Sequence, residues 1–550
     1  MKKTLIIAAA VPVISAIAAI AASNRQVQLS KLRMAEQAIS QLYVDTVNEE
    51  KLVEDAIKGM LEGLDPHSAY SNVEETRELN EPLEGNFSGI GISFNMSKDT
   101  VYVIQTIAGG PSEKAGILAG DRIISANDTV LAGVRMKRSE IMKHLRGPKG
   151  TKARLKVLRR SAGNTDTIDF TVTRDEIPIY SIDAAYMVDP TTGYIRVNKF
   201  AAETASEFRD ALKKLRKQGM KDLILDLVEN GGGYLNASVE LLSELLPPRQ
   251  LAVYTEGTAS TRYNHYTRPD SRFPLFEDGR LVVMANQYSA SAAEITAGAI
   301  QDYDRGVIVG RRTFGKGLVQ RPIPFPDGSM MRLTVAHYYT PSGRDIQKPY
   351  VKGDAEKYDS DIMDRYNGGE LMHEDSVKYD ETKRRYTLNN ARTIYGGGGI
   401  YPDIFVPLDT TEYTKYYRDL VAKGVINSYT IDYVDANRKQ LKKLYKNSQD
   451  FLNRFEVTDE MIADLKARGD KEQVKFSEEE QQRSRPLMAM IIKGLIGRDV
   501  FEEEVYWRVI NAHDPIFKKA LEIIHSPEYE TKLIESHTPG STAKPASGAN

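Results

Sequence analysis

Two short segments of the sequence carry residues that could perform acyl transfer. The first holds Ser291 among small residues, between an apolar run at 281–284 and a helix-like run at 292–300. A serine at a strand-to-helix turn is exposed, and the free amides at the start of the helix can stabilise an oxyanion. Serine is also a favoured helix cap, so Ser289 or Ser291 could equally serve only to hold the helix.

The second segment offers a base. Lys316 lies between Gly315 and Gly317, with Phe314 and Leu318 as the next neighbours in sequence. A lysine in a mostly apolar setting loses its charge more readily, so it could take a proton from a serine hydroxyl. The alternative is a solvated loop lysine, because lysine side chains are usually exposed.

The lysine segment also partly matches the sequence motif of a phosphate-binding loop. Residues 310–316 match the first seven places of that motif. The next residue is Gly317, where magnesium binding requires Ser or Thr, and Pro322 and Pro324 oppose the helix that should follow. We therefore reject nucleotide binding.

Composition narrows the class of protein further. The chain has 550 residues, which predicts several domains. Its 74 basic and 76 acidic side chains nearly cancel, so no strong field exists to attract nucleic acid. The absence of cysteine excludes thiol nucleophiles, disulfides and zinc–thiolate sites.

The N-terminus resembles an export signal. Lys2 and Lys3 precede an uncharged apolar run at 5–22, which ends in small residues. The run is also about long enough to stay as a membrane anchor, and a buried helix is the third option. We expect 1–22 to be a signal peptide or anchor, and the protein to be exported to the periplasm or anchored facing it.

The rest of the chain divides by its periodicity. Residues 23–84 have helical spacing, and 85–175 are short β-rich pieces punctuated by glycine. Residues 176–407 alternate strand-like and helix-like runs, which predicts a mixed α/β domain. Residues 408–535 are again helical, and 536–550 are rich in Ser, Thr, Pro and Ala, which predicts a disordered tail.

Two stretches of the α/β region look irregular. Residues 350–390 are polar and rich in Tyr and Asp, so we expect a surface insertion. Residues 396–399 are four consecutive glycines, which predict a flexible turn.

The two chemical segments together resemble the carboxyl-terminal processing peptidases, or tail-specific proteases. That family's signature, S-A-S-A-S-E…Q-D…T-F-G-K-G-x-V-Q, is present here with one change, Ala293 for the third serine. The resemblance implies that Ser291 is the nucleophile and Lys316, 25 residues later, its base. It also implies that Gln320 orients the lysine and that Asp302 has a supporting role.

A third family segment, D-L-R-x-N-P-G-G-x-L, matches residues 226–235 with two departures, Val228 and Gly231. The resemblance implies that the backbone N–H groups of Gly232 and Ala292 form the oxyanion hole. From the local residues alone, the glycines fit a tight strand-to-helix turn equally well.

Residues 85–175 resemble a PDZ domain. Successive N–H groups of a glycine-containing loop can hold a terminal carboxylate, and the adjoining strand edge can add the peptide as an extra strand. The alternative is a β-rich structural domain with glycine turns. The expected carboxylate-binding residues are Gly89, Ile90, Gly91 and Ile92.

We therefore expect a multidomain α/β protein. The resemblance implies a crotonase-like, mixed α/β protease core with an inserted PDZ domain, N-terminal helices and a C-terminal helical domain. Its expected function is that of a cell-envelope serine endopeptidase that acts on proteins with accessible C-termini, with a PDZ domain that recruits or senses the tail or gates the cleft. No metal or organic cofactor is needed.

Two questions stay open on the sequence alone. A non-catalytic PDZ scaffold with a degenerate protease core is the alternative function, although intact Ser291, Lys316 and Gln320 oppose it. The C-terminal helices could support homo-oligomerisation, substrate enclosure or docking of an adaptor.

Overall fold

The structure is a computed structural model that describes residues 24–97, 99–107, 109–161, 164–258, 260–269 and 274–535. The expected signal or anchor at 1–22 and the expected tail at 536–550 lie outside these residues. No helix in the described ranges is both long and apolar enough to cross a membrane. The chain forms two compact units, and the smaller, first unit comprises Met1–Thr76, Gln320–Thr334 and Tyr350–Asp359.

The first unit contains the N-terminal helices. A helix covers 24–42, and α2 (Glu49–Glu62) begins where the Asn48 side chain accepts a hydrogen bond from Lys51 N (3.0 Å). The short strand β1 (Ala69–Ser71) pairs antiparallel with the first half of β18 (Met330–Tyr339). The remaining elements that lie wholly or partly in this unit are α3 (Val73–Glu84), β17 (Leu318–Pro324) and α9 (Ala355–Asp359).

The second unit begins with the PDZ domain. Its sheet has the order β3-β4-β5-β7-β8, with β6 beside β5, so β3 forms one edge. Alternate apolar residues such as Val101, Val103 and Val157 are fully buried in its core. The strands are β3 (Ile92–Ser97), β4 (Thr100–Thr106), β5 (Arg122–Ala126), β6 (Thr129–Val130), β7 (Lys152–Ser161) and β8 (Asn164–Thr173). The helices are α4 (Pro111–Ala115) and α5 (Arg138–Leu145), and β2 (Asn86–Gly89) pairs with β9 (Asp175–Pro178) outside the sheet.

The protease core is built on a six-stranded sheet of order β10-β11-β12-β15-β16-β21. All neighbouring pairs are parallel except β10 and β11. The strands are β10 (Ile182–Met187), β11 (Thr192–Val197), β12 (Asp222–Asp226), β15 (Leu281–Ala285), β16 (Val307–Gly310) and β21 (Ile404–Phe405). The antiparallel pair β13 (Leu251–Gly257) and β14 (Ser260–Tyr266) joins the second half of β18 instead.

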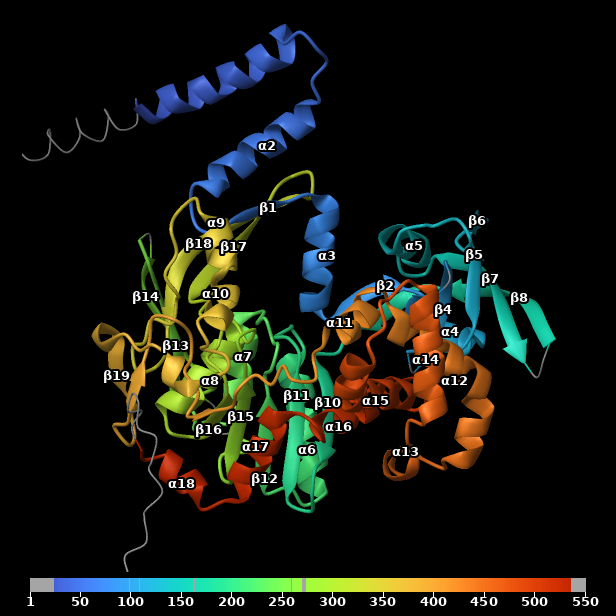
Figure 1. The fold of residues 1–550 in the computed structure, drawn as a ribbon. Coiled ribbons are helices and arrows are strands. Elements are labelled where there is room, and N and C mark those ends of the chain that lie inside the picture. The colour runs from blue at the N-terminus through green and yellow to red at the C-terminus, as the bar shows by residue number, and fades with distance from the viewer. Residues whose placement is uncertain are drawn as a thin grey trace, which may run out of the picture. The chain divides into compact units, whose positions relative to one another are not determined.

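Both faces of the core sheet are covered by helices (Figure 1). Leu223 and Leu225 of β12 pack with residues of α6 (Thr204–Lys217), α7 (Leu235–Leu242) and α8 (Ala292–Asp302). Ile224, between them, faces the other side and packs with α17 (Pro515–His525). This layered arrangement confirms the expected mixed α/β core.

A separate set of helices forms its own apolar core, which includes Leu420, Tyr429, Phe451 and Ile492. Within the expected helical region 408–535, α17 and α18 therefore pack against the protease sheet, whereas the earlier helices form this second core. The helices are α11 (Lys415–Ala422), α12 (Val425–Leu444), α13 (Ser448–Arg454), α14 (Asp459–Lys471), α15 (Glu478–Val500), α16 (Glu503–Asn511) and α18 (Glu528–Lys532).

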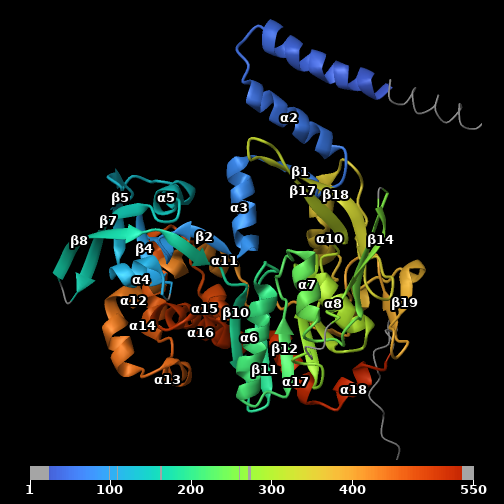
Figure 2. The ribbon, with the colours of Figure 1, turned by 180° about the vertical axis from the view of Figure 1, so that it is seen from behind.

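This helical domain contacts the PDZ domain, beside which it lies in both views (Figures 1 and 2). Ile431 of α12 is buried in a small cluster with Tyr102 and Ile104 of β4. Arg122 Nη2 of β5 pairs with Asp435 Oδ2 of α12 at 2.6 Å. The PDZ domain is thus held on the face of its sheet that these side chains share.

Most side chains of 360–390, the part of the expected surface insertion at 350–390 that belongs to the second unit, are exposed or half-buried, as expected, but a few are buried. Arg365 of α10 (Asp361–Asn367) is 5% exposed and Leu371 is 2% exposed. The short strands β19 (Arg384–Tyr386) and β20 (Thr393–Tyr395) close this segment as a hairpin-like pair. Its buried side chains pack against the protease core.

The glycine run at 396–399 is not the flexible turn that its composition suggests. Gly397 N donates to Asp345 O (2.6 Å) and Gly399 N donates to Ile346 O (2.8 Å). A Cβ atom on Gly399 would lie only 2.7 Å from the backbone oxygen of Thr313. The glycines are needed because two backbone segments approach too closely for side chains.

Candidate active site

Ser291 lies at the expected strand-to-helix turn, immediately before α8. Its backbone has φ +55° and ψ −115°, an unusual conformation for a residue with a side chain. Such strain is held in place only where the surroundings over-determine it, and it is frequent at active sites. Every residue of α8 is buried, so the helix fixes the position of the turn rigidly.

Ser291 is itself the N-cap residue of α8, with Glu294 in the capping-box position, whereas Ser289 holds the turn before it. The Ser289 hydroxyl donates to Leu227 O (2.7 Å) and accepts from Asn286 N (2.9 Å). One residue on, Ala290 N donates to Asn230 O (2.9 Å). These bonds tie the turn to the glycine-rich loop that follows β12.

A buried carboxylate, that of Glu294, joins the serine turn to the lysine loop. Oε2 accepts from Ser291 N (2.8 Å) and from Lys316 N (2.9 Å). Oε1 accepts from Gly315 N (2.7 Å) and from Thr313 Oγ1 (2.5 Å). Because one oxygen receives both N–H groups, the amide nitrogens of Ser291 and Lys316 are no more than about 6 Å apart.

Burial raises the pKa of Glu294 to about 7, although its four donors favour the ionised form. Three of the four donors are backbone N–H groups, which can only donate, and the fourth is the Thr313 hydroxyl, which could instead accept from a protonated carboxyl. We call this set of four hydrogen bonds the Glu294 clamp. All four are made as described when Glu294 is ionised.

Tyr338 of β18 makes a second link between the two segments. Its hydroxyl lies 3.1 Å from Ser291 O and is also hydrogen-bonded to Lys316 O. The side chain is almost completely buried. Glu294 thus holds the backbone N–H groups of Ser291 and Lys316, and Tyr338 holds their backbone carbonyl groups.

The lysine loop is supported from behind by two arginines and a glutamate. Arg312 makes two 2.7 Å bonds to the carboxylate of Glu370 and donates to Gly398 O (2.6 Å). Arg365 donates to Glu370 Oε1 (2.9 Å) and to Thr313 O (3.1 Å). Burial lowers the pKa of Arg365 to about 10.

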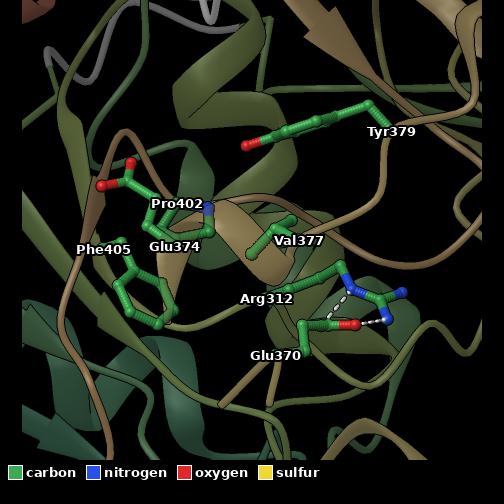
Figure 3. A pocket seen from close by; sticks show the side chains of 7 residues that line it. All are labelled: Arg312, Glu370, Glu374, Val377, Tyr379, Pro402 and Phe405. Carbon is green, nitrogen blue, oxygen red and sulfur yellow. Dashed lines mark hydrogen bonds and ion pairs between the residues drawn. The ribbon is translucent and has the colours of Figure 1, made fainter. Parts of the chain in front are cut away.

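Figure 3 shows the bidentate Arg312–Glu370 pair beside a small pocket that is also lined by Tyr379 and Phe405. The charged cluster itself fixes the backbone of Thr313 through Arg365. We assign it to loop support for that reason.

The loop at 229–233 lies against Ser291. Gly232 has φ +97°, and a Cβ atom there would lie 2.7 Å from Ser291 Cβ, so glycine is required. Its N–H, an expected oxyanion donor, donates to Asn230 Oδ1 (2.8 Å). The second expected donor, Ala292 N–H, is in the first turn of α8, where the helix supplies no acceptor.

Asp302 is not at the catalytic centre. It ends α8, 11 residues after Ser291 and about 16 Å away along the helix axis. Its carboxylate pairs with Arg344 Nη2 (2.5 Å) and accepts from Ser342 N (2.8 Å), and both ion-pair side chains are fully buried. Asp302 therefore supports the fold, because it anchors the turn after β18 to α8.

Gln320 belongs to the first unit, whereas Lys316 belongs to the second. Gln320 Nε2 lies 3.3 Å from Thr334 Oγ1, which donates to Asp65 Oδ1 (2.8 Å). Asp65 also caps its own turn through the amides of His67 and Ser68. The orienting contact with the lysine stays a prediction.

The four expected carboxylate-binding residues lie together just before and at the start of β3. Ser112 N donates to Ile90 O (3.0 Å) and Ile107 N donates to Gly91 O (3.1 Å), which fixes the loop. Gly91 has φ +75°, and a Cβ atom there would lie 2.9 Å from Ile177 Cδ1. The loop opens onto a pocket of about 350 Å³ between β3 and α5.

Sequence reasoning assigned no role to Glu294 or Asn230. A signal existed for Glu294, because a Glu three residues after a helix-capping serine is the capping-box spacing. In the described part of the chain, no group of three or more His, Cys, Asp or Glu residues is arranged to hold a metal ion.

Four family models match the chain. They are peptidase family S41 at 191–357, a PDZ domain at 88–176, the activating protease CtpB N-terminal domain at 13–76, and a family of unknown function at 416–502. The last match covers most of the separate helical core.

The chain is similar to several carboxy-terminal processing proteases. The carboxy-terminal processing protease CtpB of Bacillus subtilis is 30% identical over 436 residues, covering 77% of this chain and 88% of the relative. The carboxy-terminal-processing protease of Bartonella bacilliformis is 34% identical over 329 residues, covering 59% and 74%. A solved photosystem II D1 C-terminal processing protease is 29% identical, covers 57% and 89%, and has a TM-score of 0.32.

The matches define a protease of family S41 that carries a PDZ domain. More particularly, the chain belongs to the carboxy-terminal processing peptidases, as the sequence motifs indicated.

Glu294→Gln tests the clamp. The amide NH₂ would face at least one backbone N–H, which loses its acceptor at a cost of about 1–3 kcal/mol, and we expect kcat/KM to fall about tenfold. In the unmodified protein kcat/KM should decline as pH falls through about 7, because Glu294 takes up a proton there. A pH–rate profile of both proteins measures this. A Gln variant that keeps full activity and the same inflection would contradict the clamp.

Asp302→Asn tests the structural role of the helix end. Leaving Arg344 buried without its charge partner should lower the free energy of unfolding by about 3–5 kcal/mol. The fraction that stays folded at low temperature should keep a kcat close to the wild-type value. Thermal unfolding and steady-state kinetics on the same sample decide the matter. An unchanged Tm with a collapsed kcat would place Asp302 in the chemistry instead.

Proposed function

We propose that this carboxy-terminal processing protease is a serine endopeptidase with Ser291 as nucleophile and Lys316 as general base. The observation that supports this most is the Glu294 carboxylate, which holds the amides of both residues on a single oxygen. A structural cap would need only the serine amide. A clamp that also holds the lysine backbone fits a pair that must stay in register.

The proposed reaction is acyl transfer. Lys316, neutral before attack, takes the proton of the Ser291 hydroxyl as Oγ adds to the scissile carbonyl carbon. The lysine then gives that proton to the leaving amine, and water releases the acyl group from Ser291. The strained backbone at Ser291 fixes its half-buried side chain at the turn before α8.

Stabilisation of the oxyanion is the step that requires a change in this geometry. Ala292 N–H stands at the positive end of α8 and can donate to the developing charge. Gly232 N–H can do so only after it leaves Asn230 Oδ1. An oxyanion is a stronger acceptor than an amide oxygen, so arrival of the negative charge favours that exchange.

The PDZ domain is proposed to recruit the substrate through its C-terminus. The edge strand β3 and the preceding loop offer what a terminal carboxylate and an added strand require. Gating of the cleft by the PDZ domain stays an expectation. The contact that could transmit it is the one that Ile431 and Asp435 of α12 make with the opposite face of the PDZ sheet.

We further propose that the protein acts in the cell envelope. This rests on the basic and apolar pattern of residues 1–22, which is typical of export signals. Its substrates would then be envelope or partly unfolded proteins with accessible C-termini.

One observation favours the alternative, a PDZ scaffold without catalysis. The N–H of Gly232 is engaged by Asn230, so half of the expected oxyanion hole is occupied in this structure. A scaffold would bind tail peptides and cleave none. The cleavage experiment below separates the two functions.

Ser291→Ala, Lys316→Ala and Lys316→Arg should each reduce peptide cleavage by at least about 10³-fold. The arginine variant is the sharpest, because it keeps the positive charge but cannot give up its proton near neutral pH. Lys443→Ala, which changes an exposed lysine of α12, is the matched control and should cleave normally. Mass spectrometry of a defined peptide measures the products. Full activity of Lys316→Arg would exclude a lysine base.

A further inference from the structure

The PDZ groove has apolar walls and a basic rim. Its pocket lies between β3 and α5, and most of its lining is apolar, including Ile90, Ile92, Met142, Leu145 and Ile177. An apolar pocket next to a carboxylate-binding loop suits an apolar last residue of a peptide.

The rim carries an unusual concentration of positive charge. Residues 135–152, which include α5, hold seven Lys or Arg residues against one Glu and no Asp. Carboxylates from other segments compensate part of this excess, because Lys149 lies 3.0 Å from Asp175 and 3.5 Å from Glu176. The basic side chains that matter for the groove are those that line it.

Two arginines of this cluster line the pocket itself, one at each end of α5. Arg146 lies beside Gly89 in the carboxylate-binding loop and is paired with Glu81. Arg138, at the other end, has no carboxylate within ion-pair distance among the residues that the structure describes. Arg138 is therefore the groove cation whose charge is left for a ligand.

Arg138 occupies the place of a bound peptide. Its guanidinium lies 4.3 Å from the centre of the Phe94 ring, and Nη1 donates to Phe94 O (3.2 Å). Because α5 supplies the donor, that carbonyl faces the open side of the edge strand. A peptide added to β3 would bring its own N–H groups to this edge, so Arg138 must move aside when a peptide binds.

The register of such a peptide follows from the loop. When the peptide's C-terminal carboxylate is held at residues 89–92, its preceding residues extend along β3 toward Ser97. The peptide's N-to-C direction is then opposite to that of β3, so the two strands are antiparallel. Phe94 is two residues beyond Ile92, so it lies opposite the residue two places before the peptide's last one. Side chains two apart in a strand share a face, so this third-from-last side chain projects on the same side as the last.

We propose that this groove selects C-terminal tails with an apolar last residue and Asp or Glu at the third position from the end. On binding, the Arg138 guanidinium leaves Phe94 O and pairs with that carboxylate. The proposal rests on the recruiting role of the PDZ domain, and it names the chemistry of the tails recruited.

Binding is best measured on the full chain with Ser291→Ala, which prevents turnover. Fluorescent ten-residue peptides that end in Val and differ only at the third position from the end, Glu, Gln or Lys, are titrated and followed by anisotropy. A charge-assisted bond predicts a Glu peptide that binds about tenfold more tightly than the Gln peptide, with the difference shrinking at high salt. In Arg138→Glu the order should reverse in favour of Lys.

Lys137→Glu is the matched control, because it makes the same change of charge one residue away and does not line the pocket. It should keep the preference for Glu over Gln. Equal affinity for the Glu and Gln peptides would overturn the selectivity, as would a loss in Lys137→Glu equal to that in Arg138→Glu. Failure of all three peptides to bind would overturn tail recruitment itself, and normal cleavage by the unmodified protein would then still leave the Ser291–Lys316 mechanism standing.

Discussion

The arrangement of this active site depends on one buried carboxylate. Glu294 receives four hydrogen bonds, and two of them come from the amides of Ser291 and Lys316, the proposed nucleophile and base. Neither segment could hold that geometry alone, because Ser291 has a strained backbone and Lys316 lies in a loop between glycines. Burying an ionisable group is costly, and here the four hydrogen bonds offset only part of that cost, since burial still raises the pKa of Glu294 to about 7.

The segments around this clamp are also held by buried polar contacts between residues that are distant in sequence. Arg365 and Glu370 support the backbone of Thr313, which in turn bonds the carboxylate. The glycines at 396–399 let another segment approach that loop closely. At the far end of α8, the Asp302–Arg344 pair secures the helix that begins after Ser291. A rigid site is the common result.

The sequence predicts the local elements well and the long-range polar partners poorly. The strand-to-helix turn at Ser291 and the mixed α/β core follow from apolar runs, and the 25-residue spacing to Lys316 carries the family resemblance. Nothing local shows that Arg365, in a polar stretch, is buried against the lysine loop. The engagement of Gly232 N–H by Asn230 likewise depends on loop geometry, which side-chain types two residues apart do not determine.

The central claim is that Ser291 and Lys316 work as a pair, and covalent labelling of the serine tests it most directly. The protein and its Lys316→Arg variant are treated with a fluorophosphonate, and the labelled peptide is identified by mass spectrometry over time. The account predicts a single adduct on Ser291 that forms readily in the unmodified protein and barely in the variant, because arginine cannot accept the hydroxyl proton. Labelling of a different residue, or equal rates in the two proteins, would contradict it.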